Sequence, residues 1–179
     1  MKLLEVDGLV TELASGDGWI RAVDDVSFTV QRGETFCLVG ESGSGKSVTS
    51  LSIMGLLPPG RFRHPGGAVR LHQADQPPME LLGADSATLT ALRGERMAMI
   101  FQEPMTSLNP VLTIGEQLDE VLRIHQPWLD EQERAKRVLA MLHEVQIPRP
   151  AERMKDYPHR LSGGQRQRVM IAMALICEP

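Results

Sequence analysis

The sequence predicts an α/β fold, and three observations predict it. A continuous apolar run at residues 35–39 leads into a Gly-rich loop and then into a helical pattern. Short runs of strand-forming residues before residue 31 indicate an antiparallel β portion at the N-terminal end. From residue 113 onward, apolar residues recur at helical spacing. A helical segment is therefore expected to be inserted into the α/β domain.

Strands are expected mainly in the first 40 residues. Leu3 to Val6 and Leu9 to Leu13 are typical of short strands, and Val26 to Val30 alternates as a half-buried strand does. Thr35 to Val39 is apolar throughout, which is typical of a parallel strand covered on both faces. Cys37 in that run is accordingly expected to be buried and inert.

Further elements follow the Gly-rich loop. A helix is expected from about Lys46, and the sequence Pro58-Pro59-Gly60 should end it. One strand-like piece, Ala68 to Leu71, lies in the Pro- and Gly-rich stretch that comes next. Ser86 to Arg93 predicts a short helix, and Met97 to Phe101 predicts a second buried strand.

Two capping signals mark the inserted helices. Thr113 with Glu116, and Asp130 with Glu133, each fit a capping box at a helix start. The expected apolar stripes are Leu118, Val121, Leu122 and His125 on the first helix, and Ala135, Val138, Leu139 and Leu142 on the second. On such a stripe, His125 is expected to be packed rather than to act as a ligand. The expected parts of the domain are residues 1–110, 111–160 and 161–179.

Composition excludes several classes of protein. The net charge is −4, so a global attraction to nucleic acid is not expected. No run approaches about 20 apolar residues, and the first residues lack the apolar run of a signal peptide. The two cysteines, Cys37 and Cys177, have no metal-like spacing and favour a reducing compartment. Any membrane role is expected to come through a partner.

The Gly-rich loop matches the phosphate-binding pattern G-x-x-x-x-G-K-[ST] in full, after an apolar run and before a helix. Glycines let successive backbone N–H groups face a phosphate, and the helix start adds partial positive charge. Lys46 is expected to reach the β- and γ-phosphates, and the Ser47 hydroxyl to ligate Mg²⁺. The alternative interpretation of this loop is an ordinary Gly/Ser turn that is followed by a lysine by chance. The expected nucleotide-binding residues are Gly40, Glu41, Ser42, Gly43, Ser44, Gly45, Lys46 and Ser47.

A second phosphate-binding helix start is predicted at the sequence Leu161-Ser162-Gly163-Gly164-Gln165. Ser162 fits a helix N-cap, and Gln165 would close a capping box. Two glycines at a helix start expose N–H groups beside a serine hydroxyl, a surface that suits a phosphate. Because the Gly-rich loop already surrounds its own nucleotide, this helix start is expected to act on a nucleotide held by another subunit.

Together the two motifs resemble the ATP-binding cassette of ABC proteins, over nearly the whole chain. The resemblance implies a P-loop NTPase core with an N-terminal antiparallel β subdomain and an inserted helical subdomain. It also implies that the second motif binds the γ-phosphate across a head-to-tail dimer. Gln102 matches the glutamine of the family's Q-loop, whose implied catalytic role is to touch Mg²⁺ or the attacking water.

Longer stretches resemble the dipeptide, oligopeptide and nickel importers of this family. That resemblance implies an ATPase subunit, using ATP and Mg²⁺, that powers uptake of peptides or a similar small solute. It implies membrane permease partners, indirect action of an extracytoplasmic solute-binding protein, and a peripheral position on the cytoplasmic face of the inner membrane. The stretches that carry this resemblance are 41–50, 101–110, 157–159 and 166–175. Two further stretches, 97–110 and 115–117, are similar to the first half of the glutathione importers' ATP-binding protein.

The sequence departs from the family pattern at two places. The family's adenine-stacking aromatic falls on Leu13, and Trp19 is the nearest aromatic that could replace it. The family's Walker B motif, four apolar residues followed by Asp and Glu, is not found in the 179 residues. The fold is therefore expected to be incomplete at the C-terminus, and the chain to bind ATP without hydrolysing it. None of the histidines fits the family's switch histidine, since all precede the second motif: His64, His72, His125, His143 and His159.

Two other functions stay open at this point. One is a soluble ABC ATPase of translation or DNA repair, which the Q-loop segment and the helical lobe argue against. The other is an ATP-binding or interaction protein that does not hydrolyse ATP, which the missing carboxylates keep open.

Overall fold

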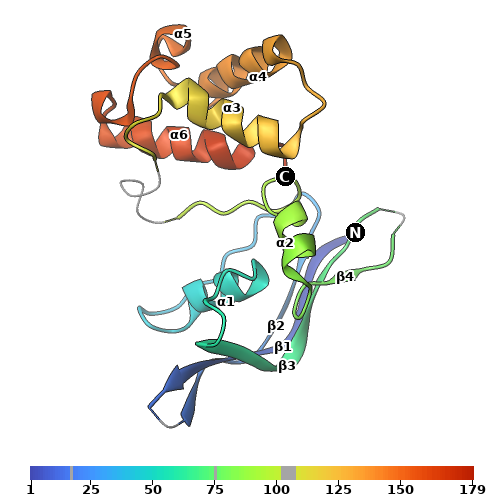
Figure 1. Ribbon diagram of the computed structural model, residues 1–179. Helices are drawn as coiled ribbons and strands as arrows, with labels where there is room; N and C mark the ends of the chain where they lie inside the picture. The colour runs from blue at the N-terminus through green and yellow to red at the C-terminus, as the bar shows by residue number, and fades with distance from the viewer. Residues whose placement is uncertain (17, 75, 102–107) are drawn as a thin grey trace. The chain divides into compact units, whose positions relative to one another are not determined.

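A long β-hairpin opens the chain (Figure 1). In this computed structural model, which describes residues 1–16, 18–74, 76–101 and 108–179, β1 (Lys2–Ser15) and β2 (Gly18–Gln31) are antiparallel partners. The separate strands predicted before residue 31 are thus merged into two. They merge because β1 and β2 stay paired across register shifts at Val6/Leu9 and at Leu9/Thr11, where the alternation of apolar and polar residues is irregular.

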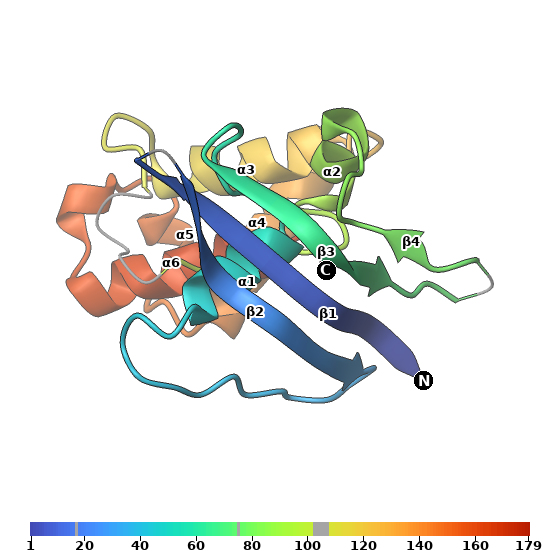
Figure 2. The same cartoon turned by 90° about the horizontal axis from the view of Figure 1, so that it is seen from below.

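Two further strands complete an antiparallel sheet. β3 (Phe62–Leu71) pairs with the free side of β1, and β4 (Met79–Glu80) pairs with β3. The strand order is β2-β1-β3-β4, and Figure 2 shows β1 between β2 and β3. The antiparallel β portion predicted at the N-terminal end is confirmed. β3 is longer than the predicted piece because it follows β1 past both register shifts.

α1 (Lys46–Ile53) is tied to this sheet by a buried group of polar side chains. The Thr11 hydroxyl of β1 is 2.9 Å from the Ser52 hydroxyl of α1 and 3.1 Å from Nδ1 of His64 on β3. Thr11 and Ser52 are buried, and burial lowers the pKa of His64. These contacts fix which face of the sheet carries α1, through a residue in the last turn of that helix.

Two predicted strands do not form. Residues 35–39 have no regular structure, and the side chain of Val39 is 86% exposed. Residues 97–101 show only an isolated bridge from Met97 to Arg93. A parallel strand forms only with hydrogen-bonded neighbours, and neither run has one among the described residues. Cys37 is exposed as a result, so the expectation that it is buried was wrong.

The chain divides into two compact units, residues 1–90 and 91–179, and α2 (Ser86–Leu92) spans the division. α2 agrees with the short helix predicted from Ser86. No helix in the described part of the chain is long and apolar enough to cross a membrane. The second unit is helical, with α3 (Ile114–His125), α4 (Glu131–Glu144), α5 (Pro150–Arg153), a 3-10 turn η1 (Pro158–Arg160) and α6 (Gly163–Leu175).

Both capping boxes predicted for the inserted helices are confirmed. Thr113 accepts from the Glu116 backbone and Asp130 from the Glu133 backbone, while each glutamate side chain binds its cap residue's N–H in return. These bonds also lower the pKa of Glu116, because the Thr113 groups donate to its ionised form. The starts of α3 and α4 are therefore fixed by pairs of residues three positions apart.

Three helices enclose the core of the second unit. Leu118 and Leu122 of α3, Val138 and Leu142 of α4, and Val169 of α6 are all fully buried. The stripe predicted on α4 is confirmed at Val138 and Leu142 and was wrong at Ala135 and Leu139, which are exposed.

His125 is packed, as predicted. Its ring lies so close to Gly94 that a Cβ at residue 94 would collide with it.

We predict that Leu142→Ala destabilises the second unit by roughly 2–5 kcal/mol, because it removes a fully buried side chain and leaves a cavity. Urea unfolding followed by circular dichroism measures the loss. The matched control is Leu139→Ala on the same helix, which should cost far less because Leu139 is partly exposed. Equal losses for the two variants would contradict the assignment of the core.

Candidate nucleotide-binding site

The Gly-rich loop of residues 40–45 leads directly into the first turn of α1. Its lysine is folded back onto the loop: the Lys46 Nζ donates to the carbonyl oxygens of Gly40 at 2.7 Å and Glu41 at 2.6 Å. It also lies 3.3 Å from the Ser44 hydroxyl. Ser47, the next residue, is exposed on the first turn of the helix. An ammonium group, a hydroxyl and the first N–H groups of a helix are thus concentrated in one loop.

Glycines at two positions shape this loop. Gly43 and Gly45 have φ angles of 82° and 90°, a region that L-residues with a side chain rarely adopt. Gly45 also lies against β2, where an added Cβ would collide with the Ala22 carbonyl oxygen. No atom lies within 4 Å of a Cβ added at Gly43. The loop is therefore seated on β2 through Gly45.

The second predicted motif forms the start of α6. The Ser162 hydroxyl accepts from the Gln165 backbone at 3.3 Å, and the Gln165 side chain accepts from the Ser162 backbone at 2.9 Å. The predicted capping box is therefore confirmed. Gly163 and Gly164 are exposed, with open space where their Cβ atoms would lie. Leu161 is buried in the core, so an anchored helix start presents its N–H groups to solvent.

Two arginines on α6 hold this helix start in place. Arg166 Nε donates to the Leu161 carbonyl oxygen at 3.1 Å. Arg168 donates to the carbonyl oxygens of Gln146 at 2.9 Å and Val145 at 3.3 Å, at the C-terminal end of α4. A cation is favourable there because the last carbonyls of a helix carry partial negative charge. The motif alone could not reveal the contacts of Arg168, because they join residues more than 20 positions apart.

The sequence profile described as ABC transporter matches residues 23–179. The chain belongs to the ABC transporter family. It is 48% identical to the dipeptide transport ATP-binding protein DppD of Bacillus subtilis over 178 residues, which cover 99% of this chain and 51% of that protein. It is 48% identical over 178 residues to the oligopeptide transport ATP-binding protein OppD of Salmonella typhimurium, covering 99% and 50%.

The chain spans about half the length of these curated relatives. Among solved structures, it is similar to the dimeric post-hydrolysis state of the ATP-binding cassette MJ0796 bound to ADP and Pi. The TM-score is 0.81 at 28% identity, covering 99% of this chain and 71% of that chain. A second dimeric structure of the same cassette gives a TM-score of 0.83 at the same identity and coverage. The predicted ABC ATPase fold is therefore confirmed.

One further residue of the ABC cassette was expected to join the site. Gln102, the predicted Q-loop glutamine, lies outside the described residues. The loop of residues 40–47 lies in the first compact unit, and the start of α6 lies in the second.

The structure does not bring Trp19 to the Gly-rich loop. Trp19 pairs with Ala14 and shares a face of the sheet with Glu12, whose carboxylate binds Arg63. The Arg63 guanidinium lies 4.3 Å from the centroid of the Trp19 ring. The opposite face carries α1, as the bond from Thr11 to α1 shows. Successive strand residues point to opposite faces, so the hairpin register directs Trp19 away from α1.

Leu13, the position that matches the family's aromatic, is on the same face as α1. It pairs with Ile20 on β2 and with Phe62 on β3. Phe62 lines a small hollow of about 140 Å³ together with Pro58 and His64. The position that matches the family's aromatic is therefore aliphatic in this chain, as the sequence indicated.

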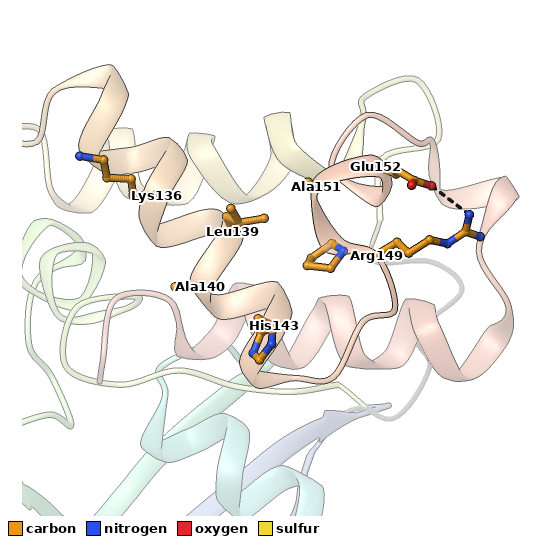
Figure 3. Close-up of a pocket in the computed structure, with 8 residues that line it drawn as sticks. Lys136, Leu139, Ala140, His143, Arg149, Ala151 and Glu152 are labelled. Atoms are coloured by element: carbon orange, nitrogen blue, oxygen red, sulfur yellow. Dashed lines mark ion pairs between the residues drawn. The ribbon is translucent and has the colours of Figure 1, made fainter.

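A groove lies between α4 and α5 in the second unit (Figure 3). It is a cavity of about 620 Å³ with Leu139 in its wall, and Arg149 and Glu152 form an ion pair of 3.1 Å beside it. A second hollow of about 620 Å³ shares Lys136, Leu139 and Ala151 and extends to the start of α3. The groove combines an apolar wall with basic side chains, and its full lining is Lys136, Leu139, Ala140, His143, Arg149, Pro150, Ala151 and Glu152.

We predict that Gly45→Ala disrupts the loop much more than Gly43→Ala. Both substitutions place a side chain at positive φ, which costs about 1–2 kcal/mol. Only Gly45→Ala adds a collision with the backbone of β2. The expected result is a larger drop in the thermal unfolding temperature for Gly45→Ala. Equal drops would show that the loop is not seated on Ala22.

Proposed function

We propose that this chain is the ATP-binding part of a subunit that energises peptide import. The observation that carries the proposal is the pair of helix starts: α1 follows a Gly-rich loop with Lys46, and α6 begins at the capped Ser162. A helix N-terminus attracts anions through its free N–H groups and its dipole. Two such starts suit the phosphates of one nucleotide held between two copies of the domain.

The residues have separate tasks in this arrangement. Lys46 and the backbone of residues 40–45 would hold the β- and γ-phosphates in one copy. Ser162 and Gly163 of the second copy would meet the γ-phosphate from the other side, giving a head-to-tail dimer. The cassette MJ0796, to which this chain is similar, is dimeric in both structures. The remaining residues of the signature motif, which is residues 161–165, are Leu161, Gly164 and Gln165, and they would keep that helix start anchored and capped.

Mg²⁺ fits this site as an ion shared with the nucleotide. In the described part of the chain, no cluster of His, Cys, Asp or Glu could hold a metal ion without other ligands. The exposed Ser47 hydroxyl at the first turn of α1 is the side chain that would hold it, and Gln102 would add a second ligand. When bound, Mg²⁺ neutralises charge on the β- and γ-phosphates.

Hydrolysis of ATP is proposed for the intact protein rather than for these residues alone. Gln102 would position the attacking water, but activating it calls for a carboxylate that follows an apolar strand. No run of four apolar residues followed by Asp and Glu occurs in the 179 residues. That observation favours a second candidate, an ATP-binding or interaction protein without hydrolytic activity.

A peptide is the proposed solute class, because the relatives are named as dipeptide and oligopeptide transport proteins. Glutathione, itself a small peptide, falls within this class. The proposed partners are membrane permease subunits on the cytoplasmic face of the inner membrane, with an extracytoplasmic solute-binding protein acting through them. The groove of α4 and α5 supports the proposal, because an apolar wall with basic side chains suits an amphipathic segment of a permease. Nucleic acid is not proposed as a partner, given the net charge of −4.

We predict that Lys46→Ala lowers the affinity for ATP by at least about tenfold, because it removes charge-assisted bonds to phosphate. Ser162→Arg should leave the affinity of the monomer unchanged and prevent ATP-driven dimerisation. Isothermal titration calorimetry measures the first effect and analytical ultracentrifugation the second. Lys136→Ala, which removes an equal charge in the groove, is the control. Loss of monomer binding in Ser162→Arg would exclude the arrangement across two copies.

We also predict that the 179-residue chain binds ATP and releases no phosphate above background. The reason is the missing pair of carboxylates. A phosphate-release assay on protein freed of host ATPases makes the measurement, and Lys46→Ala supplies the background rate. Turnover that Lys46→Ala abolishes would show that other residues of this chain activate the water.

A further inference from the structure

Two aromatic rings project from the turn before α6. Tyr157 and His159 are stacked, with ring centroids 5.7 Å apart and planes inclined by 8°. The side chain of Tyr157 is 41% exposed, and His159 is exposed as well. Pro158 between them is buried. The pair therefore presents a flat aromatic surface to solvent within five residues of Ser162.

This surface is held rigidly by the start of α3. The Ile114 N–H donates to the Asp156 carbonyl oxygen at 2.9 Å, and the Gly115 N–H donates to the Met154 carbonyl oxygen at 2.8 Å. These bonds occupy donors that α3 would otherwise leave unpaired. Leu161 anchors the other end of the turn in the core. Because the turn is already ordered, a ligand that stacks on it has little conformational entropy to remove.

The charges around the rings suit an anionic ligand. Lys155 and Arg160, on either side of the pair, are exposed. Asp156 is engaged on the inner side, where its carboxylate binds Arg153 at 2.6 Å and lies 3.9 Å from Arg160. A ligand that carries phosphates and an aromatic base matches both the rings and the cations.

At the position that matches the family's adenine-stacking residue, this chain has no aromatic side chain. Leu13 and its partner Ile20 are aliphatic, and Trp19 lies on the opposite face of the sheet beneath Arg63. In the proposed function, α6 of one copy meets the phosphates bound to another. The nearest exposed rings to that helix start in the sequence are those of Tyr157 and His159.

We propose that Tyr157, backed by His159, stacks on the purine base of ATP bound to the Gly-rich loop of a second copy of this chain. The inference rests on the proposed function, because it needs α6 to act across two copies. It assigns the adenine contact to the turn before the signature motif. It also makes the aromatic surface a determinant of base specificity.

The test compares dimerisation driven by ATP with dimerisation driven by UTP, followed by analytical ultracentrifugation. Tyr157→Ala should weaken ATP-driven dimerisation by about tenfold, the effect of losing one stacked base. It should also reduce the preference for ATP over UTP, since a purine stacks over a larger area than a pyrimidine. Tyr157→Phe should restore both properties, because it keeps the ring. Thermal unfolding shows whether each variant folds as the parent chain does.

The outcomes separate this inference from the proposed function. If Ser162→Arg abolishes dimerisation while Tyr157→Ala changes neither its strength nor its base preference, the aromatic contact is excluded and the proposed function stands. If Tyr157→Ala weakens dimerisation equally with ATP and UTP, its role is structural and the inference fails. A parent chain that does not dimerise with ATP would overturn the arrangement across two copies, and this inference with it.

Discussion

The first turn of an α-helix leaves backbone N–H groups without an intrahelical acceptor, and the site depends on how this chain treats them. At α3, carbonyl groups from the turn around Asp156 occupy two of them. At α1 the N-cap is Gly45, which has no side chain to compete for the donors. At α6, Ser162 takes one donor and glycines leave the rest exposed. The start of α3 is thus closed by packing, while the two starts predicted to bind phosphate stay open.

Features encoded by neighbouring residues could be predicted from the sequence. The capping boxes at Thr113, Asp130 and Ser162 each depend on two residues three positions apart, so the residue types at those positions are enough to predict them. The Gly-rich loop is of the same kind, since its glycines and Lys46 are contiguous. The alternating runs predicted the antiparallel sheet, but they did not predict the length of its strands. A β-bulge lets a strand continue where the alternation of apolar and polar residues is broken, and no single residue type predicts a bulge.

Features that depend on distant partners could not be predicted. The apolar runs at 35–39 and 97–101 have the composition of strands, but a strand also needs a neighbour to bind. The sequence suggested Trp19 as an adenine contact because it is the aromatic residue nearest to Leu13 along the chain. The register of β1 and β2 instead decides to which face of the sheet Trp19 points. The support of α6 by Arg168 depends on the end of α4, which only the packed helices bring near.

The unpaired run at 35–39 has a consequence for how the chain behaves in concentrated solution. The run contains no charge and no proline, and Phe36, Leu38 and Val39 are all exposed. Short uncharged segments of this composition add readily to strands of other molecules. Its Phe36 ring stacks on Phe28, which covers one side chain, and the described residues offer the backbone of the run no strand partner. Five residues that take no part in binding phosphate thus form an aggregation-prone segment.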